Sequence, residues 1–350
     1  MAVDITFKEK LGDFLLEMHL QSESRRIGIL GASGCGKSMT LKSIAGIVKP
    51  DSGRIVIDNK VLYDSAQKVN LKPQSRNVGY LFQNYALFPT MSVKSNIAAG
   101  LKGTKYEKNR RAAEMLKKFQ LEGLEDRLPG ELSGGQQQRA ALARIMAYEP
   151  DVILLDEPFS ALDVFLKDRL QQEMIELLAD YEGTVILVSH SRDEIYRFCD
   201  ELLIMDAGNV ICYGKTKEIF ADPQWKEAAR LTGCKNISRV IQLGDGTLEV
   251  PDWGIRLVLD RHIPEDISCI GFRAHEFIPV WGVQTKNSFP VRLSSMAELP
   301  FEKKYFLKGA GEDTEEICWF VQREWWDLLD EKGLPDYLEI PEDKILLLKG

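Results

Sequence analysis

The chain has 350 residues, of which 44% are hydrophobic and 28% are charged, and its formal net charge is −8 at pH 7. This composition is ordinary for a globular protein, and the negative charge without a Lys or Arg block argues against broad binding to nucleic acid. No apolar run approaches the ~20 residues of a membrane-spanning helix, and the first residues lack the apolar segment of a signal peptide.

The first two-thirds of the chain alternates strand-like and helix-like segments. Residues 25–30, 151–156 and 183–190 are almost continuously apolar, which is typical of parallel strands covered on both faces. Helical patterns occupy residues 109–118 and 168–178. The alternation predicts an α/β layered domain.

The first predicted strand runs directly into the segment GASGCGKS, which precedes a helical pattern. The segment fits the phosphate-loop pattern G-x-x-x-x-G-K-[ST], in which backbone N–H groups and a helix N-terminus surround phosphate oxygens. Lys37 would reach the β- and γ-phosphates, and the Ser38 hydroxyl would bind Mg²⁺. We therefore predict a nucleotide site made by Gly31, Ala32, Ser33, Gly34, Cys35, Gly36, Lys37 and Ser38.

A second glycine-containing helix start lies at LSGGQ, residues 132–136. Good helix formers follow it, yet its first turn contains Ser133, Gly134 and Gly135, which stabilise a helix poorly. A helix N-terminus with bare amides is suited to binding an anion. The alternative is a serine-capped helix, which explains Ser133 but not the paired glycines.

The segment VILLDEP, residues 152–158, places two acidic residues after a buried strand. Open α/β sheets bind ligands at the carboxyl ends of their strands. Asp156 is therefore a candidate for holding Mg²⁺, and Glu157 is a candidate for orienting or activating a water molecule. Two acids at a strand end are otherwise an ordinary solvated terminus, and the phosphate loop earlier in the chain favours the catalytic interpretation.

The character of the chain changes after about residue 232. Residues 240–250 predict a hairpin with a Gly-Asp-Gly turn, and further short strands follow it. Five of the six tryptophans fall in this region. These features predict a small, mostly β, C-terminal domain, in which His275 and the tryptophans are expected in the core or an interface.

Six motifs in one order resemble the nucleotide-binding subunit of an ABC transporter. They are GASGCGKS, YLFQNYALFP with Gln83, LSGGQ, VILLDEP, SALD with Asp163, and VSH with His190. The resemblance covers about residues 1–230. It implies a RecA-like P-loop ABC ATPase domain at 1–232, with a helical subdomain at about 88–150. It also implies an OB-like, TOBE-type regulatory domain at 233–350.

The resemblance implies roles for residues outside the phosphate loop. Gln83 would contact the metal or the attacking water, and His190 would contact the γ-phosphate and hold Glu157 in register. In a head-to-tail dimer, the 132–136 segment would close over ATP bound by a second subunit, and Asp163 would stabilise that contact. The residues expected to close over the nucleotide are Ser133, Gly134, Gly135 and Gln136.

Three positions near the loop raise separate questions. Met39 stands where the family commonly has Thr or Ser, so one phosphate hydrogen bond is missing or is supplied by Thr40. Phe14 is the nearest candidate for stacking on adenine, although its alternation with Leu16 favours a core position. A helix N-terminus can lower a thiol pKa, so Cys35 is either a reactive thiol or a small loop filler.

The segments around Gln83 and at 230–238 resemble the importer branch, and most of all the molybdate-importer ATPase. This implies an ATP- and Mg²⁺-dependent hydrolase that drives uptake of an oxyanion, although no clear SARNQ-like oxyanion motif occurs in the C-terminal domain. Sulfate, tungstate, a sugar or a polyamine are alternative cargoes. A soluble ABC ATPase acting on ribosomes or DNA usually has two cassettes or a long insertion, and the N-K-x-D motif of P-loop GTPases is absent here.

The partners that the resemblance implies are a second ATPase subunit, transmembrane permease subunits and, indirectly, a substrate-binding protein. Six cysteines without a CxxC pair favour reduced thiols in the cytoplasm. We therefore expect the chain at the cytoplasmic face of the membrane as a peripheral subunit, without nucleic acid as a partner.

Overall fold

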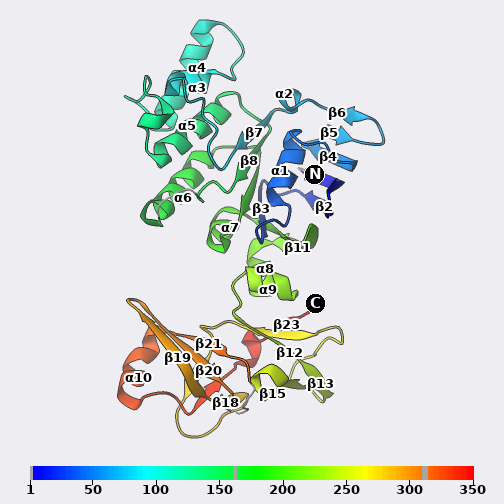
Figure 1. Ribbon diagram of the computed structural model, residues 1–350, viewed down its shortest axis with the longest axis vertical. Coiled ribbons are helices and arrows are strands. Elements are labelled where there is room, and N and C mark those ends of the chain that lie inside the picture. Colours follow the sequence, from blue (N-terminus) through cyan, green and yellow to red (C-terminus); the bar gives the residue numbers. More distant parts are fainter. Residues whose placement is uncertain (1–2, 161–163, 310–313) are drawn as a thin grey trace. The chain divides into compact units, whose positions relative to one another are not determined.

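The computed structural model describes residues 3–160, 164–309 and 314–350. The chain divides into two compact units, residues 1–217 and 218–350 (Figure 1). Within the described ranges, no helix is both long and apolar enough to cross a membrane.

The first unit contains a six-stranded sheet in the order β11-β10-β3-β9-β8-β7. All neighbouring strands are parallel except β10 and β11. Ile27 and Ile29 pack with α1 in one core, whereas Gly28 lies against Ile195 of α7 on the other face. This two-sided cover explains the continuous apolar runs and confirms the predicted α/β layers. The strands are β3 (Arg26–Gly31), β7 (Val78–Leu81), β8 (Val152–Asp156), β9 (Thr184–Ser189), β10 (Glu201–Asp206) and β11 (Asn209–Lys215).

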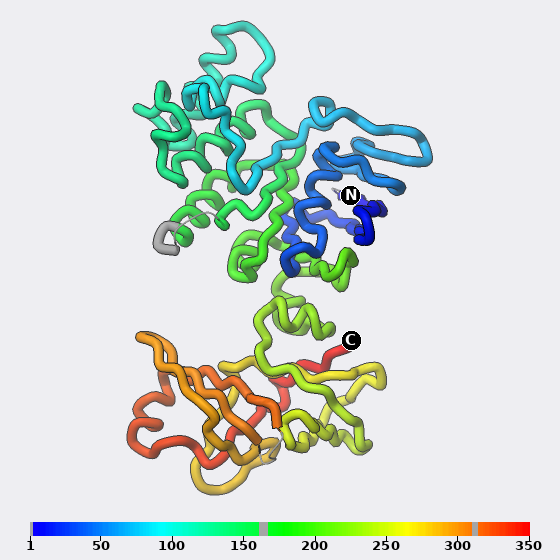
Figure 2. The backbone as a smooth tube through the Cα atoms, in the orientation of Figure 1, coloured from blue at the N-terminus to red at the C-terminus, as the bar shows by residue number. Residues whose placement is uncertain are grey.

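A five-stranded antiparallel sheet in the order β2-β1-β4-β5-β6 covers α1 from the other side. Figure 2 shows the N-terminal hairpin beside the 52–64 segment, and Ile5 of β1 pairs with Ile55 of β4. Phe7, Leu16 and Met18 point into the shared core. The strands are β1 (Val3–Leu11), β2 (Phe14–Ser22), β4 (Ser52–Ile57), β5 (Lys60–Asp64) and β6 (Val69–Asn70).

Helices fill the chain between β7 and β8, in the part predicted as a helical subdomain. The helix predicted at 109–118 begins earlier, because Thr104 and Glu107 form a capping box at its start. The helix predicted at 168–178 also begins earlier, at Val164. The helices of this unit are α1 (Lys37–Ala45), α2 (Pro73–Arg76), α3 (Val93–Ala98), α4 (Lys105–Lys118), η1 (Pro129–Glu131), α5 (Gly134–Ala147), α6 (Val164–Leu178) and α7 (Arg192–Phe198).

The second unit is mostly β, as predicted, and this agrees with an OB-like domain. Its described residues form four three-stranded sheets, β12-β16-β23, β13-β14-β15, β17-β22-β18 and β19-β20-β21. The predicted hairpin is confirmed, since β13 pairs with β14 across Asp245 and Gly246, both at positive φ. The strands are β12 (Asn236–Arg239), β13 (Ile241–Gly244), β14 (Thr247–Val250), β15 (Ile255–Val258), β16 (Cys269–Phe272), β17 (Ile278–Val280), β18 (Ser288–Pro290), β19 (Arg292–Leu299), β20 (Glu302–Lys308), β21 (Ile317–Val321), β22 (Tyr337–Glu339) and β23 (Leu346–Leu348).

The compact units divide earlier than the predicted domain boundary after residue 232. Residues 218–232 pack with the second unit, because the Arg273 guanidinium donates to the carbonyl oxygens of Phe220 and Thr232 and Trp225 bridges to Lys349. The helices that begin at or after residue 216 are α8 (Thr216–Ala221), α9 (Lys226–Leu231), η2 (Pro251–Trp253), η3 (Arg323–Trp325), α10 (Trp326–Lys332) and η4 (Glu342–Lys344).

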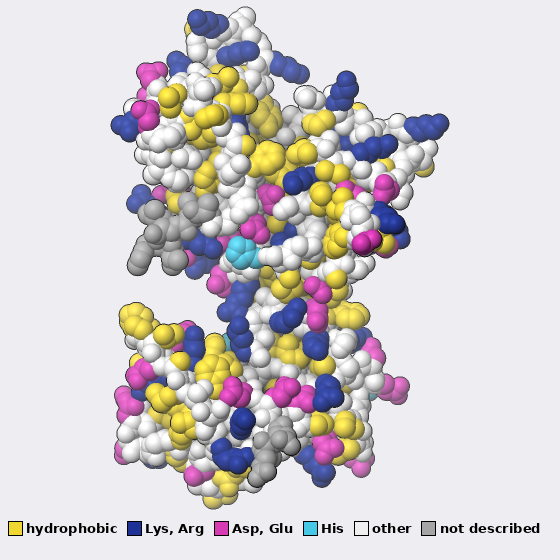
Figure 3. Space-filling view, in the orientation of Figure 1, with side chains coloured by type: hydrophobic (Ala, Val, Ile, Leu, Met, Phe, Trp, Pro, Cys, Tyr) yellow, Lys and Arg dark blue, Asp and Glu magenta, His cyan; other side chains and the backbone are white. Residues whose placement is uncertain are grey.

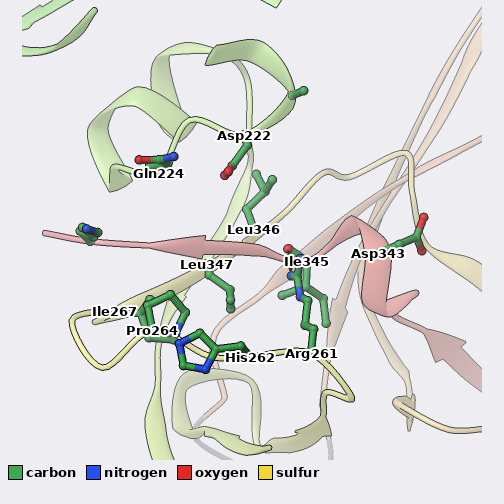
Figure 4. A pocket seen from close by; sticks show the side chains of 12 residues that line it. Asp222, Gln224, Arg261, His262, Pro264, Ile267, Asp343, Ile345, Leu346 and Leu347 are labelled. Carbon is green, nitrogen blue, oxygen red and sulfur yellow. Dashed lines mark hydrogen bonds between the residues drawn. The ribbon is translucent and has the colours of Figure 1, made fainter. Parts of the chain in front are cut away.

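The second unit has its own hydrophobic core. Trp253 and Trp319 are fully buried in it, and the other three tryptophans pack against it. His275 is not part of this core, because half of its side chain is exposed beside Glu276. A pocket of about 400 Å³ opens near β23, with Arg261, His262 and Asp222 among the side chains around it (Figure 4).

Candidate functional site

The phosphate loop has the predicted strand–loop–helix geometry. β3 ends at Gly31 and α1 begins at Lys37. Gly34 and Gly36 have φ angles of 83° and 107°, a region that favours glycine. The Lys37 ammonium is buried and donates to the carbonyl oxygens of Gly31 and Ala32, each at 2.8 Å. The loop is therefore closed around its own lysine.

Burial favours one of the two alternatives left open for Cys35 and one of the two left open for Met39. The Cys35 thiol is buried, and burial raises its pKa although the Lys37 ammonium acts in the opposite direction, so it is a loop filler rather than an activated thiol. Thr40 does not replace the hydroxyl missing at Met39. Its side chain is buried and donates within the helix to the carbonyl oxygen of Gly36 at 3.1 Å.

Asp156 lies at the carboxyl end of β8, where each of its carboxylate oxygens has one partner. The Ser38 hydroxyl donates to Oδ1 at 2.7 Å, and the Tyr80 hydroxyl donates to Oδ2 at 2.8 Å. Burial and the neighbouring negative charge of Asp156 raise the pKa of the Tyr80 phenol, which keeps it a donor. The described residues contain no cluster of three or more His, Cys, Asp or Glu side chains for a metal. One carboxylate and one hydroxyl still fit Mg²⁺, which is usually held by few protein oxygens together with water and phosphate.

Glu157 has a strained backbone at the same sheet edge. Its φ is 46°, which is unfavourable for a side chain with a Cβ, and its N–H donates to the carbonyl oxygen of Val188 in β9 at 3.0 Å. His190 follows β9, and its Nδ1 lies 3.3 Å from Oε2 of Glu157. The structure thus brings together the predicted acid and the predicted histidine, which are 33 positions apart in the chain.

A pocket of about 530 Å³ lies against the phosphate loop. Phe14 lies on the same face of β2 as Leu16 and packs against the core, as the alternation predicts. It is only half-buried, however, and it also lines this pocket, whereas Leu16 is fully buried. The lining residues are Leu11, Phe14, Ser33, Gly34, Gly36, Lys37, Ser38, Met39, Lys42, Gln83 and Glu157.

The start of α5 is a capped helix. The Ser133 hydroxyl accepts from the Gln136 N–H, and the Gln136 side chain accepts from the Ser133 N–H at 2.9 Å. A Cβ on Gly135 would lie 2.9 Å from a methyl carbon of Leu170, so close packing against α6 also favours a small residue there. None of residues 132–136 is among those that line the pocket at the phosphate loop. Asp163 lies outside the described residues.

Sequence reasoning missed two groups of residues at this edge. Tyr80 was not identified, although it precedes Gln83 by three positions in a predicted motif. The second group supports the backbone beside His190. Glu194 is buried in α7, accepts from the Ser189 hydroxyl at 2.6 Å and pairs with Lys167 at 2.6 Å. No local pattern marks either contact, because each joins separate elements.

Comparisons with known proteins agree with this geometry. Residues 16–160 match the family described as ABC transporter. The sulfate/thiosulfate import ATP-binding protein of Thermosynechococcus vestitus is 38% identical over 79% of this chain and 83% of that protein. The molybdate/tungstate import ATP-binding protein of Pyrococcus horikoshii is 37% identical, with 79% of each chain covered. An Fe(3+) import ATP-binding protein of Fusobacterium nucleatum is 31% identical over 99% of this chain and 93% of that protein.

A solved structure supports the same assignment. It is a dimeric ATP-binding cassette in a post-hydrolysis state with ADP and phosphate, 30% identical, with a TM-score of 0.50 over 61% of this chain and 97% of that one. The sequence relatives, the family match and the geometry of the phosphate loop agree. The chain belongs to the ATP-binding subunits of ABC importers.

Proposed function

We propose that this chain binds and hydrolyses ATP with Mg²⁺ in a head-to-tail dimer, and that this cycle drives uptake of an oxyanion through a membrane permease. The observation that carries the proposal is a single pocket against the phosphate loop that gathers Lys37, Ser38, Gln83 and Glu157. Asp156 lies within hydrogen-bond distance of one of these residues, and His190 lies 3.3 Å from another.

Each group at the pocket has a distinct task. The backbone N–H groups of residues 31–38 and the Lys37 ammonium would bind the phosphates, because an anion is favoured at a helix N-terminus. Ser38, Asp156 and Gln83 would hold Mg²⁺, which neutralises developing charge on the phosphates when bound. Phe14 would stack on the base, and its presence in the lining of the pocket supports this role.

Glu157 is the residue that we assign to water orientation. Its strained backbone is fixed between the ends of β8 and β9, so its carboxylate is positioned before the nucleotide binds. His190 would hold that carboxylate in register and reach the γ-phosphate from the same edge.

The separation of residues 132–136 from the pocket supports a shared site. Ser133, Gly134, Gly135 and Gln136 do not line the pocket of their own subunit, and Ser133 and Gly134 are exposed at the start of α5. In the proposed dimer, this helix start faces the γ-phosphate held by the second subunit, and Asp163 lies at the contact. The dimeric cassette structure is consistent with such an assembly.

The permease would dock on the same unit. A groove of about 740 Å³ between the helical part and β7 is lined by basic side chains, including Lys102, Lys108 and Arg111, and by the acidic Glu107 and Glu149. Figure 3 shows basic side chains over α4. The loop after Gln83 is tied to α5, since Arg144 donates to the carbonyl oxygen of Ala86 and lies over the Phe88 ring. A permease on this surface would place the chain at the cytoplasmic face of the membrane, and would connect it indirectly to a substrate-binding protein.

The cargo that we favour is an oxyanion, and molybdate first. Two relatives carry the names of oxyanion importers, one for sulfate and thiosulfate and one for molybdate and tungstate. A third relative is named for Fe(3+), so sulfate, tungstate and unrelated cargoes such as a sugar or a polyamine are the alternatives. The C-terminal unit is assigned a regulatory role on the same resemblance. ATPase activity of the complex with its permease, compared across molybdate, tungstate and sulfate, tests the cargo.

The test of the catalytic assignment is Glu157→Gln. We expect this variant to keep ATP binding, to hydrolyse ATP at least about 100-fold more slowly, and to accumulate a closed dimer, because the amide cannot accept a proton from water. Equilibrium titration with ATP measures binding, a phosphate-release assay measures hydrolysis, and size-exclusion chromatography with ATP measures the dimer.

The control for this test is Glu182→Gln, the same change at an exposed carboxylate away from the pocket. Glu182→Gln should bind ATP, hydrolyse ATP and form dimers as the unmodified chain does. Normal ATP turnover by Glu157→Gln would show that another group orients the water. Stimulation of ATP hydrolysis by ribosomes or DNA would instead indicate the remote alternative, a soluble ABC ATPase.

A further inference from the structure

The hydroxyl of Tyr80 reaches the proposed metal-binding carboxylate from the neighbouring strand. Tyr80 lies in β7, opposite Leu154 of the parallel strand β8, and Asp156 ends β8 two positions later. The hydroxyl donates to Oδ2 of Asp156 at 2.8 Å, and both side chains are only 8% exposed. A buried hydrogen bond to a charged group is stronger than most and is costly to leave unmade.

This contact determines how Asp156 presents its two oxygens. Oδ2 is occupied by a donor from β7, whereas Oδ1 accepts from Ser38, the phosphate-loop residue proposed to bind Mg²⁺. A carboxylate held at Oδ2 cannot rotate freely about its last side-chain bond, so Oδ1 stays directed towards the loop. The metal would then meet an oxygen that is already in position.

The ring of Tyr80 is itself fixed. It stacks on Phe82 with ring centroids 4.2 Å apart and an interplanar angle of 29°. Phe82 directly precedes Gln83, the other side chain from this segment that is proposed to bind the metal. One aromatic pair therefore supports both Asp156 and the start of the loop that carries Gln83.

We propose that Tyr80 is a positioning residue for Mg²⁺, which acts through Asp156 by holding Oδ2 so that Oδ1 and Ser38 bind the metal together. This inference rests on the proposed magnesium–ATP site. It predicts a specific loss in metal-dependent nucleotide binding rather than a general loss of nucleotide affinity, because Tyr80 is not among the residues that line the pocket.

The experiment compares Tyr80→Phe with the matched control Tyr63→Phe. Phenylalanine keeps each ring, so the Phe82 stack is preserved and only one hydroxyl is lost. The Tyr63 hydroxyl is also buried and donates to the carbonyl oxygen of Pro50 at 2.7 Å, in a part of the unit that does not line the pocket. Both variants therefore lose one buried hydrogen bond, and thermal unfolding without nucleotide or metal measures that shared effect.

The readout is the affinity of the full-length chain for a non-hydrolysable ATP analogue, measured by calorimetry in EDTA and again in saturating Mg²⁺. For Tyr80→Phe, we expect the affinity in EDTA to stay within about twofold of the unmodified chain, while the enhancement by Mg²⁺ falls about tenfold. For Tyr63→Phe, neither value should change. In an Asp156→Asn background, adding Tyr80→Phe should cause little further loss, because both changes act on one carboxylate.

The outcomes separate this inference from the proposed site. If Asp156→Asn removes the Mg²⁺ enhancement and Tyr80→Phe leaves it intact, the positioning role is wrong and the metal site stands. If Tyr80→Phe weakens binding equally in EDTA and in Mg²⁺, the role is structural and the inference also fails. If the unmodified chain shows no Mg²⁺ enhancement, or Asp156→Asn retains it, the proposed metal site itself is wrong.

Discussion

At the scale of single residues, the candidate site contains two unfavourable features, a strained backbone and a buried charge, which hydrogen bonds stabilise. Glu157 adopts a φ of 46°, which costs roughly 1–3 kcal/mol, and a backbone hydrogen bond to β9 maintains it. Lys37 is buried, with its ammonium held by two carbonyl oxygens of the loop. Such features persist where the surrounding structure enforces them, and both occur at the edge proposed to bind ATP.

The role of Lys37 is testable by Lys37→Ala. We expect the affinity for ATP to fall about 10- to 100-fold, because the phosphates lose a charge-assisted hydrogen bond. Lys49→Ala removes the same charge from an exposed position outside the pocket, and should bind ATP as the unmodified chain does. Equilibrium titration with ATP measures both variants. Equal loss in the two would mean that overall charge, rather than the loop contact, determines affinity.

At the scale of elements, two helices of the first unit begin in the same way. Both α4 and α5 have a capping box, formed by Thr104 with Glu107 and by Ser133 with Gln136. The cap accounts for Ser133, and close packing on Leu170 accounts for Gly135, so the anion-binding role of this helix start stays a prediction. The duplication supplies an internal control that separates the two roles of Ser133.

The comparison is Ser133→Ala against Thr104→Ala. Each change removes the hydroxyl that accepts from a backbone N–H of the first turn, and Thr104→Ala also removes a hydrogen bond to the Glu107 carboxylate. Each should lower the free energy of unfolding by about 1 kcal/mol in denaturant titrations. Only Ser133→Ala should also weaken ATP-dependent dimerisation, measured by light scattering with an ATP analogue. Dimerisation that is equally weakened, or equally intact, in the two variants would contradict the shared site.

At the scale of the whole molecule, the chain has two compact units, each with its own core. We therefore expect two transitions in scanning calorimetry. ATP should stabilise only the first unit, by about 2.7 kcal/mol when the free ligand is 100 times Kd. Lys37→Ala should reduce the stabilisation of the first unit by ATP. Trp253→Ala removes a buried side chain from the core of the second unit, so it should lower only the unfolding temperature of that unit. A single calorimetric transition whose unfolding temperature rises with ATP would contradict this expectation.

Much of the fold and part of the site were predictable, because their signals are local. Continuous apolar runs indicated the parallel strands, and the spacing of glycines with Lys37 and Ser38 indicated the phosphate loop. Local sequence patterns predicted less well the properties of side chains that depend on burial in the folded protein. The alternation that favoured a core position for Phe14 does not show that it lines the pocket, and a helix N-terminus was a poor guide to the Cys35 thiol, whose burial has the larger effect on its pKa.

The sequence by itself determined which functional side chains are present and which strands, helices and loops carry them. The reason is that an apolar strand, a glycine-rich phosphate loop and a pair of acidic residues at a strand end are each encoded within about ten neighbouring residues. Only the tertiary structure decided that Asp156 meets Ser38 and Tyr80, and that His190 meets Glu157. The physical reason is the strand order β3-β9-β8-β7, which differs from chain order. It brings the carboxyl ends of these strands, distant in the chain, to one edge of the sheet.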